Sequence, residues 1–109
     1  MTRYVKGWLK GDLKIIIGTL SKDAVIVESD MSSYKGLEDI KKWIENWNFS
    51  GSKVDSWRIK SFYEAGNTFL FEWHFKCFVN KRVHEFDGIS IGKIKEQQIY
   101  YLREYRTKT

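Results

Sequence analysis

FLFEWHFKCFV, residues 69–79, is the stretch of this 109-residue sequence that decides the fold. Alternate residues of a β-strand point to opposite faces of its sheet. As a strand, this stretch has one wholly apolar face, which carries Phe69, Phe71, Trp73, Phe75, Cys77 and Val79. The opposite face is mixed and carries Leu70, Glu72, His74, Lys76 and Phe78. The surroundings of the mixed face decide whether Glu72 and His74 are surface residues or members of a site.

Further strands lie on both sides of this stretch. β-Branched and aromatic residues between short polar turns predict strands over residues 53–64, 68–79, 82–94 and 98–106. The connections are Ala65-Gly66-Asn67, Asn80-Lys81 and Lys95-Glu96-Gln97. Connections this short join antiparallel neighbours, so the sequence predicts four consecutive antiparallel strands.

The first half of the chain is predicted to be mainly helical. Apolar residues at helical spacing predict helices within residues 2–20, with a break at Gly11-Asp12, because glycine ends helices and aspartate begins them. A short strand is predicted at residues 21–29, a polar loop at 30–35 and an amphipathic helix after Gly36. Helices followed by a run of strands indicate an α+β fold, with the helices packed on one face of an antiparallel sheet.

Length, charge and cysteine content narrow the class of protein. A chain of 109 residues predicts one domain, residues 1–109. The net charge is +5, but the basic residues are scattered among acidic ones, which argues against a nucleic-acid partner. The single Cys77 excludes an internal disulfide and favours a reducing compartment. The first residues lack the apolar run of a signal peptide or membrane span, so we expect a cytoplasmic protein without a membrane partner.

Several short motifs follow one another along the chain: Arg3-Tyr4-Val5, Gly11-Asp12-Leu13, Asp23-Ala24-Val25, residues 34–40 (YKGLEDI), Glu72-Trp73, residues 86–90 (FDGIS) and Arg103-Glu104-Tyr105. In this order they resemble the nuclear transport factor 2-like superfamily and its SnoaL-like, ketosteroid isomerase-like members. Together they cover nearly the whole chain. The resemblance implies a cystatin-like cone, in which N-terminal helices pack on a strongly curved antiparallel sheet around an apolar pocket. It does not specify a reaction, because this fold hosts many.

The resemblance also implies an arrangement of the two strand faces. In such proteins the convex side of the sheet often forms a homodimer, which would place Phe71, Trp73 and Phe75 against a partner chain and point Glu72 and His74 into the pocket. Periodicity alone favours the opposite arrangement, in which the apolar row packs on the helices and the mixed row meets water. The resemblance tips our expectation toward the first arrangement.

Tyr4 and Glu28 are the first candidate catalytic residues. By resemblance, Tyr4 matches the tyrosine that donates a hydrogen bond to the substrate oxyanion in ketosteroid isomerase, and Glu28 matches the general-base aspartate of that enzyme. Ser90 stands where the isomerase has its second, protonated acid, and this departure argues against steroid isomerisation. The alternatives are a core tyrosine and a solvent-facing glutamate.

Glu72, His74 and Glu104 form the second candidate group. They match the positions at which limonene epoxide hydrolase has two carboxylates bridged by an arginine, but here the arginine is missing and one carboxylate is histidine. The resemblance therefore implies an acid–base cluster in which His74 titrates between two carboxylates, rather than epoxide hydrolysis. The alternative is a surface pair across strands.

A pocket of this kind would bind a small apolar molecule. Its expected walls are Trp8, Ile26, Trp43, Phe86, Gly88, Ser90 and Leu102, for which ordinary core packing is the alternative. We find no metal-ligand spacing, phosphate loop or nucleophile motif, so we expect neither metal nor cofactor. The predicted function is cofactor-free isomerase, cyclase or hydratase chemistry on a small apolar carbonyl compound. The alternatives are a ligand-binding module or a protein-interaction module.

Overall fold

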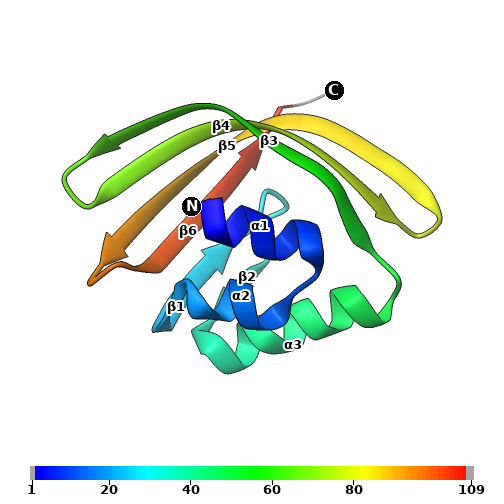
Figure 1. Ribbon diagram of the computed structural model, residues 1–109, viewed down its shortest axis with the longest axis horizontal. Helices are drawn as coiled ribbons and strands as arrows, with labels where there is room; N and C mark the ends of the chain where they lie inside the picture. Colours follow the sequence, from blue (N-terminus) through cyan, green and yellow to red (C-terminus); the bar gives the residue numbers. More distant parts are fainter. Residues whose placement is uncertain (1, 108–109) are drawn as a thin grey trace.

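A computed structural model describes residues 2–107 and shows helices packed on one curved sheet (Figure 1). The elements in chain order are α1 (Thr2–Lys10), α2 (Leu13–Gly18), β1 (Leu20–Val27), β2 (Ser33–Lys35), α3 (Gly36–Phe49), β3 (Lys53–Ala65), β4 (Thr68–Val79), β5 (Arg82–Lys95) and β6 (Gln98–Arg106). The long strands arch over the helices, which cover the concave side of the sheet (Figure 1). This arrangement confirms the predicted α+β cone.

The sheet has the strand order β2-β1-β6-β5-β4-β3 and is mostly antiparallel. The hairpin turns at Asn80-Lys81 and Glu96-Gln97 have positive φ at both residues, as two-residue turns that match the twist of a sheet require. Between residues 2 and 107 one pair of neighbouring strands, β1 with β6, runs parallel. That pairing brings the end of β1, where Glu28 follows Val27, beside Glu104 on β6.

The first half of the chain differs from the prediction in one segment. Asp12 caps α2 as expected, since its carboxylate accepts a hydrogen bond from the Ile15 amide at 3.2 Å. The predicted loop at residues 30–35, however, contains strand β2, which pairs with β1 through Val25 and Lys35. Backbone pairing, rather than local propensity, forms this strand. Among the described residues, no helix has both the length and the apolar character needed to cross a membrane.

The apolar row of β4 faces the helices, so the arrangement implied by the resemblance is wrong. Phe69, Phe71 and Trp73 are 1%, 0% and 3% exposed within a single chain. Phe71 and Trp73 belong to the core beneath the sheet, with Phe75 packed against it. A homodimer through Phe71, Trp73 and Phe75 is therefore excluded, because the inner side of the cone already covers these side chains. Periodicity alone had favoured this arrangement.

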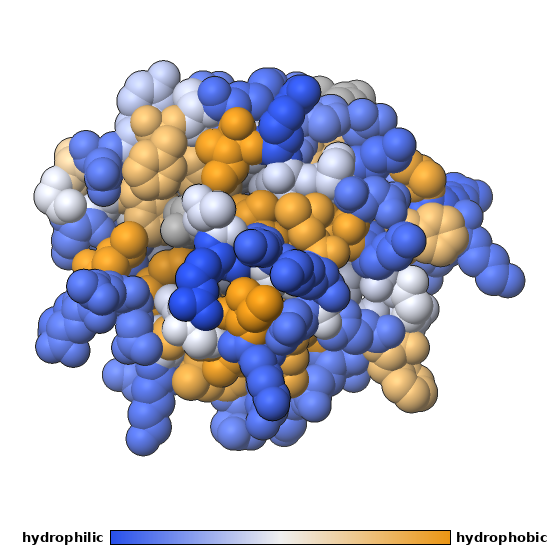
Figure 2. Space-filling model, viewed as in Figure 1, coloured by the Kyte–Doolittle hydropathy of each residue, from blue (hydrophilic) through white to orange (hydrophobic). Residues whose placement is uncertain are grey.

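The opposite, mixed row faces outward. Glu72 is exposed, and His74 lies among charged side chains on the convex side of the sheet. The surface seen in Figure 2 is mostly hydrophilic, with hydrophobic residues gathered in patches between the hydrophilic ones. Charged side chains outside and rings inside give the sheet the alternation expected of one solvated and one buried face.

Two glycines of β5 let aromatic rings lie flat across the sheet. Gly88 pairs with Trp73, and Gly92 pairs with Phe69. A Cβ atom built on Gly88 would collide with the Trp73 ring and with the backbone oxygen of Tyr105. Gly88 is thus a packing position under Trp73 rather than the pocket wall that we expected.

Gly88→Ala is expected to lower the free energy of unfolding by about 2–3 kcal/mol, because the backbone of β6 cannot move away without breaking the sheet. Urea unfolding of both proteins measures the change. Gly66→Ala is not a suitable control, because Gly66 has φ +61°. Gly18→Ala is suitable, because nothing lies within 4 Å of an added Cβ. Equal effects of the two changes would contradict the packing role of Gly88.

Candidate functional site

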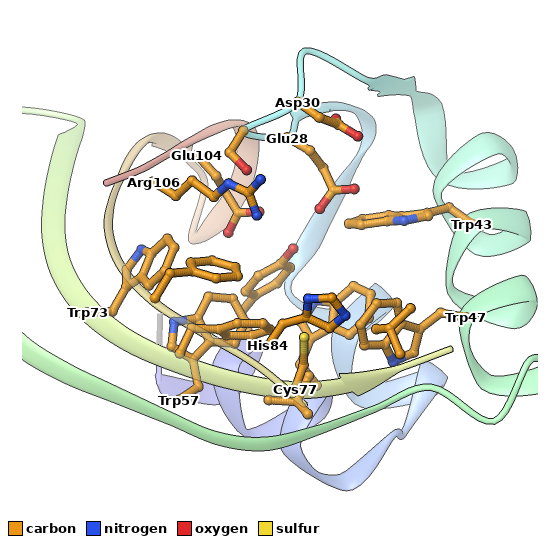
Figure 3. A pocket seen from close by; sticks show the side chains of 17 residues that line it. Glu28, Asp30, Trp43, Trp47, Trp57, Trp73, Cys77, His84, Glu104 and Arg106 are labelled. Carbon is orange, nitrogen blue, oxygen red and sulfur yellow. The ribbon is translucent and has the colours of Figure 1, made fainter. Parts of the chain in front are cut away.

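A cavity of about 350 Å³ lies between the helices and the concave side of the sheet. All five tryptophans of the chain line it, and they come from four elements: α1, α3, β3 and β4. They are Trp8, Trp43, Trp47, Trp57 and Trp73, joined by Phe75 and Phe86 (Figure 3). A concave site of this size lined mostly by rings suits a small, largely apolar ligand.

The rings contact one another around the cavity at varied angles. Trp8 is tilted 58° from Trp43, with ring centroids 5.0 Å apart, and is perpendicular to Trp47 at 5.7 Å. Trp57 meets Phe75 edge to face at 5.2 Å. Tyr34, outside the cavity, stacks on Trp43 at 4.3 Å. Edge-to-face and stacked pairs are favourable aromatic geometries, so the walls are held in place by their own contacts.

Three side chains in the cavity can donate or accept a proton: Tyr4 from α1, Glu28 from the end of β1 and Glu104 from β6. Burial, followed by the charge of Asp30, raises the pKa of Glu28 to about 7. Burial, followed by the charge of Glu28, raises the pKa of Glu104 to about 8. Burial raises the pKa of Tyr4 well above its usual value, with further contributions from the two glutamates. At neutral pH one carboxyl therefore exchanges its proton easily, while the other and the phenol keep theirs.

Ser90 connects Glu104 to the aromatic wall. The fully buried Ser90 hydroxyl accepts a hydrogen bond from the Trp73 indole N–H at 2.9 Å. The same hydroxyl donates to the Glu104 carboxylate at 3.5 Å, which opposes the rise in the pKa of Glu104. Ser90 therefore supports the cavity from behind and does not line it, contrary to our expectation.

Ser90→Ala is expected to lower the free energy of unfolding by about 1–3 kcal/mol, because it leaves the Trp73 N–H buried without an acceptor. Urea unfolding measures the loss. Ser61→Ala is the matched control, because the Ser61 hydroxyl makes its hydrogen bond on the outer face. If both variants lowered the free energy of unfolding by the same small amount, the buried hydrogen bond would contribute no more to stability than the exposed one.

The mouth of the cavity carries polar and charged groups. Asp30, His84 and Arg106 line it together with Cys77, which pairs across the strands with His84. The Arg106 guanidinium lies over the Phe86 ring at 5.0 Å. Hydrogen bonds from Ser32 lower the pKa of Asp30, so this carboxylate is ionised at neutral pH. Burial raises the pKa of Cys77 to about 11, so its thiol stays protonated.

Six of the predicted site residues line this cavity: Tyr4, Trp8, Glu28, Trp43, Phe86 and Glu104. Four predicted walls do not. Ile26 and Leu102 are fully buried in the core, and Gly88 and Ser90 lie behind Trp73. These four residues hold the walls in position rather than forming them.

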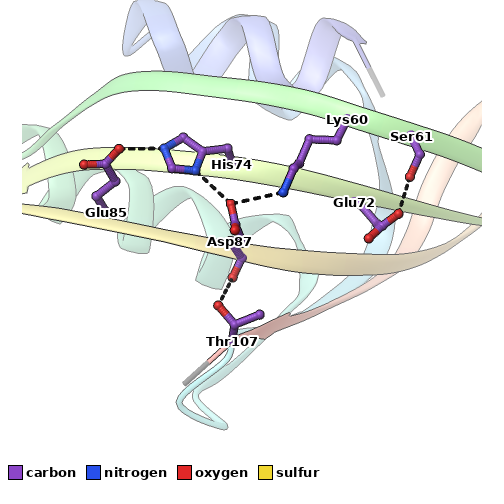
Figure 4. A network of polar contacts seen from close by, with 7 residues as sticks. All are labelled: Lys60, Ser61, Glu72, His74, Glu85, Asp87 and Thr107. Carbon is purple, nitrogen blue, oxygen red and sulfur yellow. Dashed lines mark hydrogen bonds and ion pairs between the residues drawn. The ribbon is translucent and has the colours of Figure 1, made fainter. Parts of the chain in front are cut away.

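The predicted cluster of Glu72, His74 and Glu104 is wrong. Glu104 lies in the cavity, whereas Glu72 and His74 lie on the outer face of the sheet. His74 makes ion pairs with Asp87 at 2.8 Å and Glu85 at 2.7 Å (Figure 4). Those hydrogen bonds, the one with Asp87 foremost, raise the pKa of His74. Glu72 accepts a hydrogen bond from Ser61 at 2.6 Å (Figure 4).

The cavity contains functional candidates that the sequence analysis missed. They are Trp47, Trp57, Trp73, Phe75, His84 and Arg106. Three of them were visible as apolar strand positions, and reading the apolar row of β4 as the inner face would have found Trp73 and Phe75. His84 and Arg106 carry no local sequence signal, because the pairing of β4, β5 and β6 brings them together.

Solved structures of other proteins share this fold at low sequence identity. A hypothetical protein with a ketosteroid isomerase-like fold from Catenulispora acidiphila, in complex with trimethylamine, is 15% identical with a TM-score of 0.84, covering 95% of this chain and 82% of that chain. An LEH-like epoxide hydrolase from Mycobacterium tuberculosis is 13% identical with a TM-score of 0.86, covering 97% and 78%. A proposed polyketide cyclase from Xanthomonas campestris is 13% identical with a TM-score of 0.78, covering 97% and 86%.

At these low identities the similarity shows a shared fold, and a shared fold does not specify a reaction. No curated protein matches the sequence. The family model of the SnoaL-like domain, however, matches residues 1–102. The chain therefore belongs to the SnoaL-like domain family.

Proposed function

We propose that this protein binds a small, largely apolar carbonyl compound and moves a proton on it without a cofactor. Glu28 acts as the base, and Tyr4 and protonated Glu104 donate hydrogen bonds to the carbonyl oxygen. The observation that carries the proposal is the convergence of these three groups in one ring-lined cavity. In water, without burial in such a cavity, the pKa values of these groups would not be raised in this way.

The proton affinities of the three groups suit these roles. A base works best when its pKa lies near the working pH, and the pKa of Glu28 is about 7. Removal of a proton next to a carbonyl places negative charge on the oxygen, which neutral donors in a water-poor site stabilise. Glu104, with a pKa of about 8, and Tyr4, whose pKa is raised further, still hold their protons at neutral pH.

Glu104 can take the role of the second, protonated acid, which ketosteroid isomerase has at the position of Ser90. Ser90 cannot serve as the protonated acid, but it hydrogen-bonds Glu104, and Glu104 enters the cavity from the neighbouring strand. Support for a ligand site comes from the fold neighbours, of which one was solved in complex with the small molecule trimethylamine and others are described as an epoxide hydrolase and a proposed polyketide cyclase.

Deuterium exchange tests the proposal without knowledge of the natural substrate. The protein is incubated in D₂O with a panel of small cyclic ketones, and ¹H NMR follows the loss of the signals from protons next to the carbonyl. We expect exchange faster than in buffer for the ketones that also raise the melting temperature. Ketones that raise the melting temperature without any exchange would contradict the proposed catalysis and favour a binding protein.

A further inference from the structure

The helix side of the cavity is lined by three indole rings, Trp8, Trp43 and Trp47, which contact one another. Trp8 stands at 58° to Trp43 and at 90° to Trp47, so the rings do not stack on one another. Tyr34 covers one face of Trp43, which leaves the other face and the ring edge to contact the cavity. Rings set at such angles present both aromatic faces and ring edges to a group bound in the cavity.

Aromatic faces differ from aliphatic walls in their charge distribution. The face of a ring carries partial negative charge and attracts a cation, most strongly for tryptophan. Leucine, isoleucine or valine would serve a neutral apolar group as well, yet all five tryptophans of the chain line this cavity. The choice of side chain therefore favours a positively charged group with an apolar surface.

The carboxyl groups of the cavity also favour a positively charged ligand group. Glu28, Asp30 and Glu104 line it against one arginine, Arg106. The Glu28 carboxyl points toward the ring of Trp43 (Figure 3). At the mouth, the Arg106 guanidinium already lies over the Phe86 ring at 5.0 Å. The lining residues that the described helices contribute, by contrast, include rings but no basic side chain.

We infer that the part of the cavity lined by Trp8, Trp43 and Trp47 binds an alkylated ammonium group, with Glu28 as its counter-ion. This inference rests on the proposed function and deepens it: the small carbonyl compound carries a tertiary or quaternary ammonium group. The methyl groups contact the rings, and the charge faces Glu28. A cation beside Glu28 also favours loss of its proton, which readies the base when the ligand is bound.

Binding of such a ligand depends on pH through Glu28. The charged and titratable groups that face it are Tyr4 from α1, Tyr34 from β2, Cys77 from β4, His84 from β5, Glu104 and Arg106 from β6, and Asp30 in its own loop. Because the pKa of Glu28 is about 7, raising the pH from 6 to 8 increases its ionised fraction about tenfold.

The test compares choline with 3,3-dimethylbutan-1-ol, a neutral molecule of the same shape, by isothermal titration calorimetry. We expect choline to bind at least tenfold more tightly at pH 8, to lose about tenfold in affinity at pH 6 and to release protons on binding at pH 6. Glu28→Gln should reduce the preference for choline to less than threefold. Trp43→Leu should weaken the binding of choline more than the binding of the alcohol. Glu45→Gln makes an equal charge change on the exposed side of α3 and should change neither affinity.

The outcomes separate this inference from the proposed function. Equal affinity for the two compounds, or a preference that survives Glu28→Gln, would overturn it. Failure of both compounds to bind, while neutral ketones still raise the melting temperature, would overturn it and leave the proposed function standing. Failure of all of them would overturn both. Because Trp43→Leu could unfold the protein, Trp43→Phe, which keeps a ring, provides the second variant, and far-UV circular dichroism checks each fold.

Discussion

Glu28→Gln is expected to slow deuterium exchange on a bound ketone by about 10²–10⁴-fold, the range that a positioned general base contributes. Glutamine has nearly the same shape as glutamate but cannot accept the proton. The ring-lined walls stay intact, so the affinity for a neutral ketone should change little. ¹H NMR exchange rates and melting-temperature shifts, measured on the same samples, separate the two effects.

The matched control for this prediction is Glu45→Gln, which removes one exposed carboxylate from the outside of α3. Glu28→Asp keeps the carboxylate but shortens its reach, so it should retain more activity than Glu28→Gln. Exchange that continues at the wild-type rate in Glu28→Gln would assign the base to another group, with Glu104 as the next carboxyl in the cavity.

The pH profile of exchange should be bell-shaped. Activity rises as Glu28 loses its proton, with a pKa of about 7, and falls as Glu104 loses the proton that it donates, with a pKa of about 8. The two carboxyls repel each other, so the two limbs report the titration of the pair rather than of either residue alone. In Glu104→Gln the alkaline limb should disappear, because an amide N–H₂ remains a donor at every pH.

Local patterns in the sequence predicted the elements and part of the site. Turn residues such as Asn80-Lys81 mark their hairpin because their backbone conformation is demanding. Tyr4, Glu28 and Glu104 could be nominated from motif positions alone, and the structure brings them to one cavity. Strand β2 could not be predicted, because its hydrogen bonds come from pairing with β1 rather than from its own residues.

The face of β4 shows where pattern and resemblance diverged. Alternation separates Trp73 from His74 on any strand, but it does not state which row meets the helices. Burial decides this, because rings such as Phe71 gain most from contact with the helices, and charged groups such as His74 keep their ion pairs in water. A cavity is harder still to foresee. Trp47 and Trp57 were readable as core residues, but the cavity that they line forms only when α3 and β3 pack together.

Glu104→Gln is expected to make the protein more stable at pH 8 while leaving it nearly unchanged at pH 5. A carboxyl whose pKa is about 8 when folded, against 4.5 for the free group, holds its proton more tightly in the folded state. Stability from this group is therefore complete at pH values below about 4.5 and is lost progressively as the pH rises toward 8. At about 1.4 kcal/mol per pKa unit, the loss between pH 5 and 8 is about 2–4 kcal/mol.

Glutamine removes this loss because it does not titrate. The difference in melting temperature between Glu104→Gln and wild type should therefore grow between pH 5 and pH 8 by on the order of 10 °C, which thermal unfolding at a series of pH values measures. A variant that follows the wild-type pH dependence in parallel would show that the Glu104 carboxyl is solvated rather than held in the cavity.

His74 titrates in the same window and needs its own control. Its pKa is raised in the folded state by Asp87 and Glu85, so its contribution is present below its unfolded pKa near 6.5 and is also lost as the pH rises through the folded value. Because His74 is present in both proteins, its contribution cancels when Glu104→Gln is compared with wild type at each pH. A His74→Gln background checks that the two groups titrate independently, and loss of the stabilisation at pH 8 there would show that they are coupled. If the stabilisation persists, the cavity holds a proton on Glu104 at neutral pH, which its role as a hydrogen-bond donor requires.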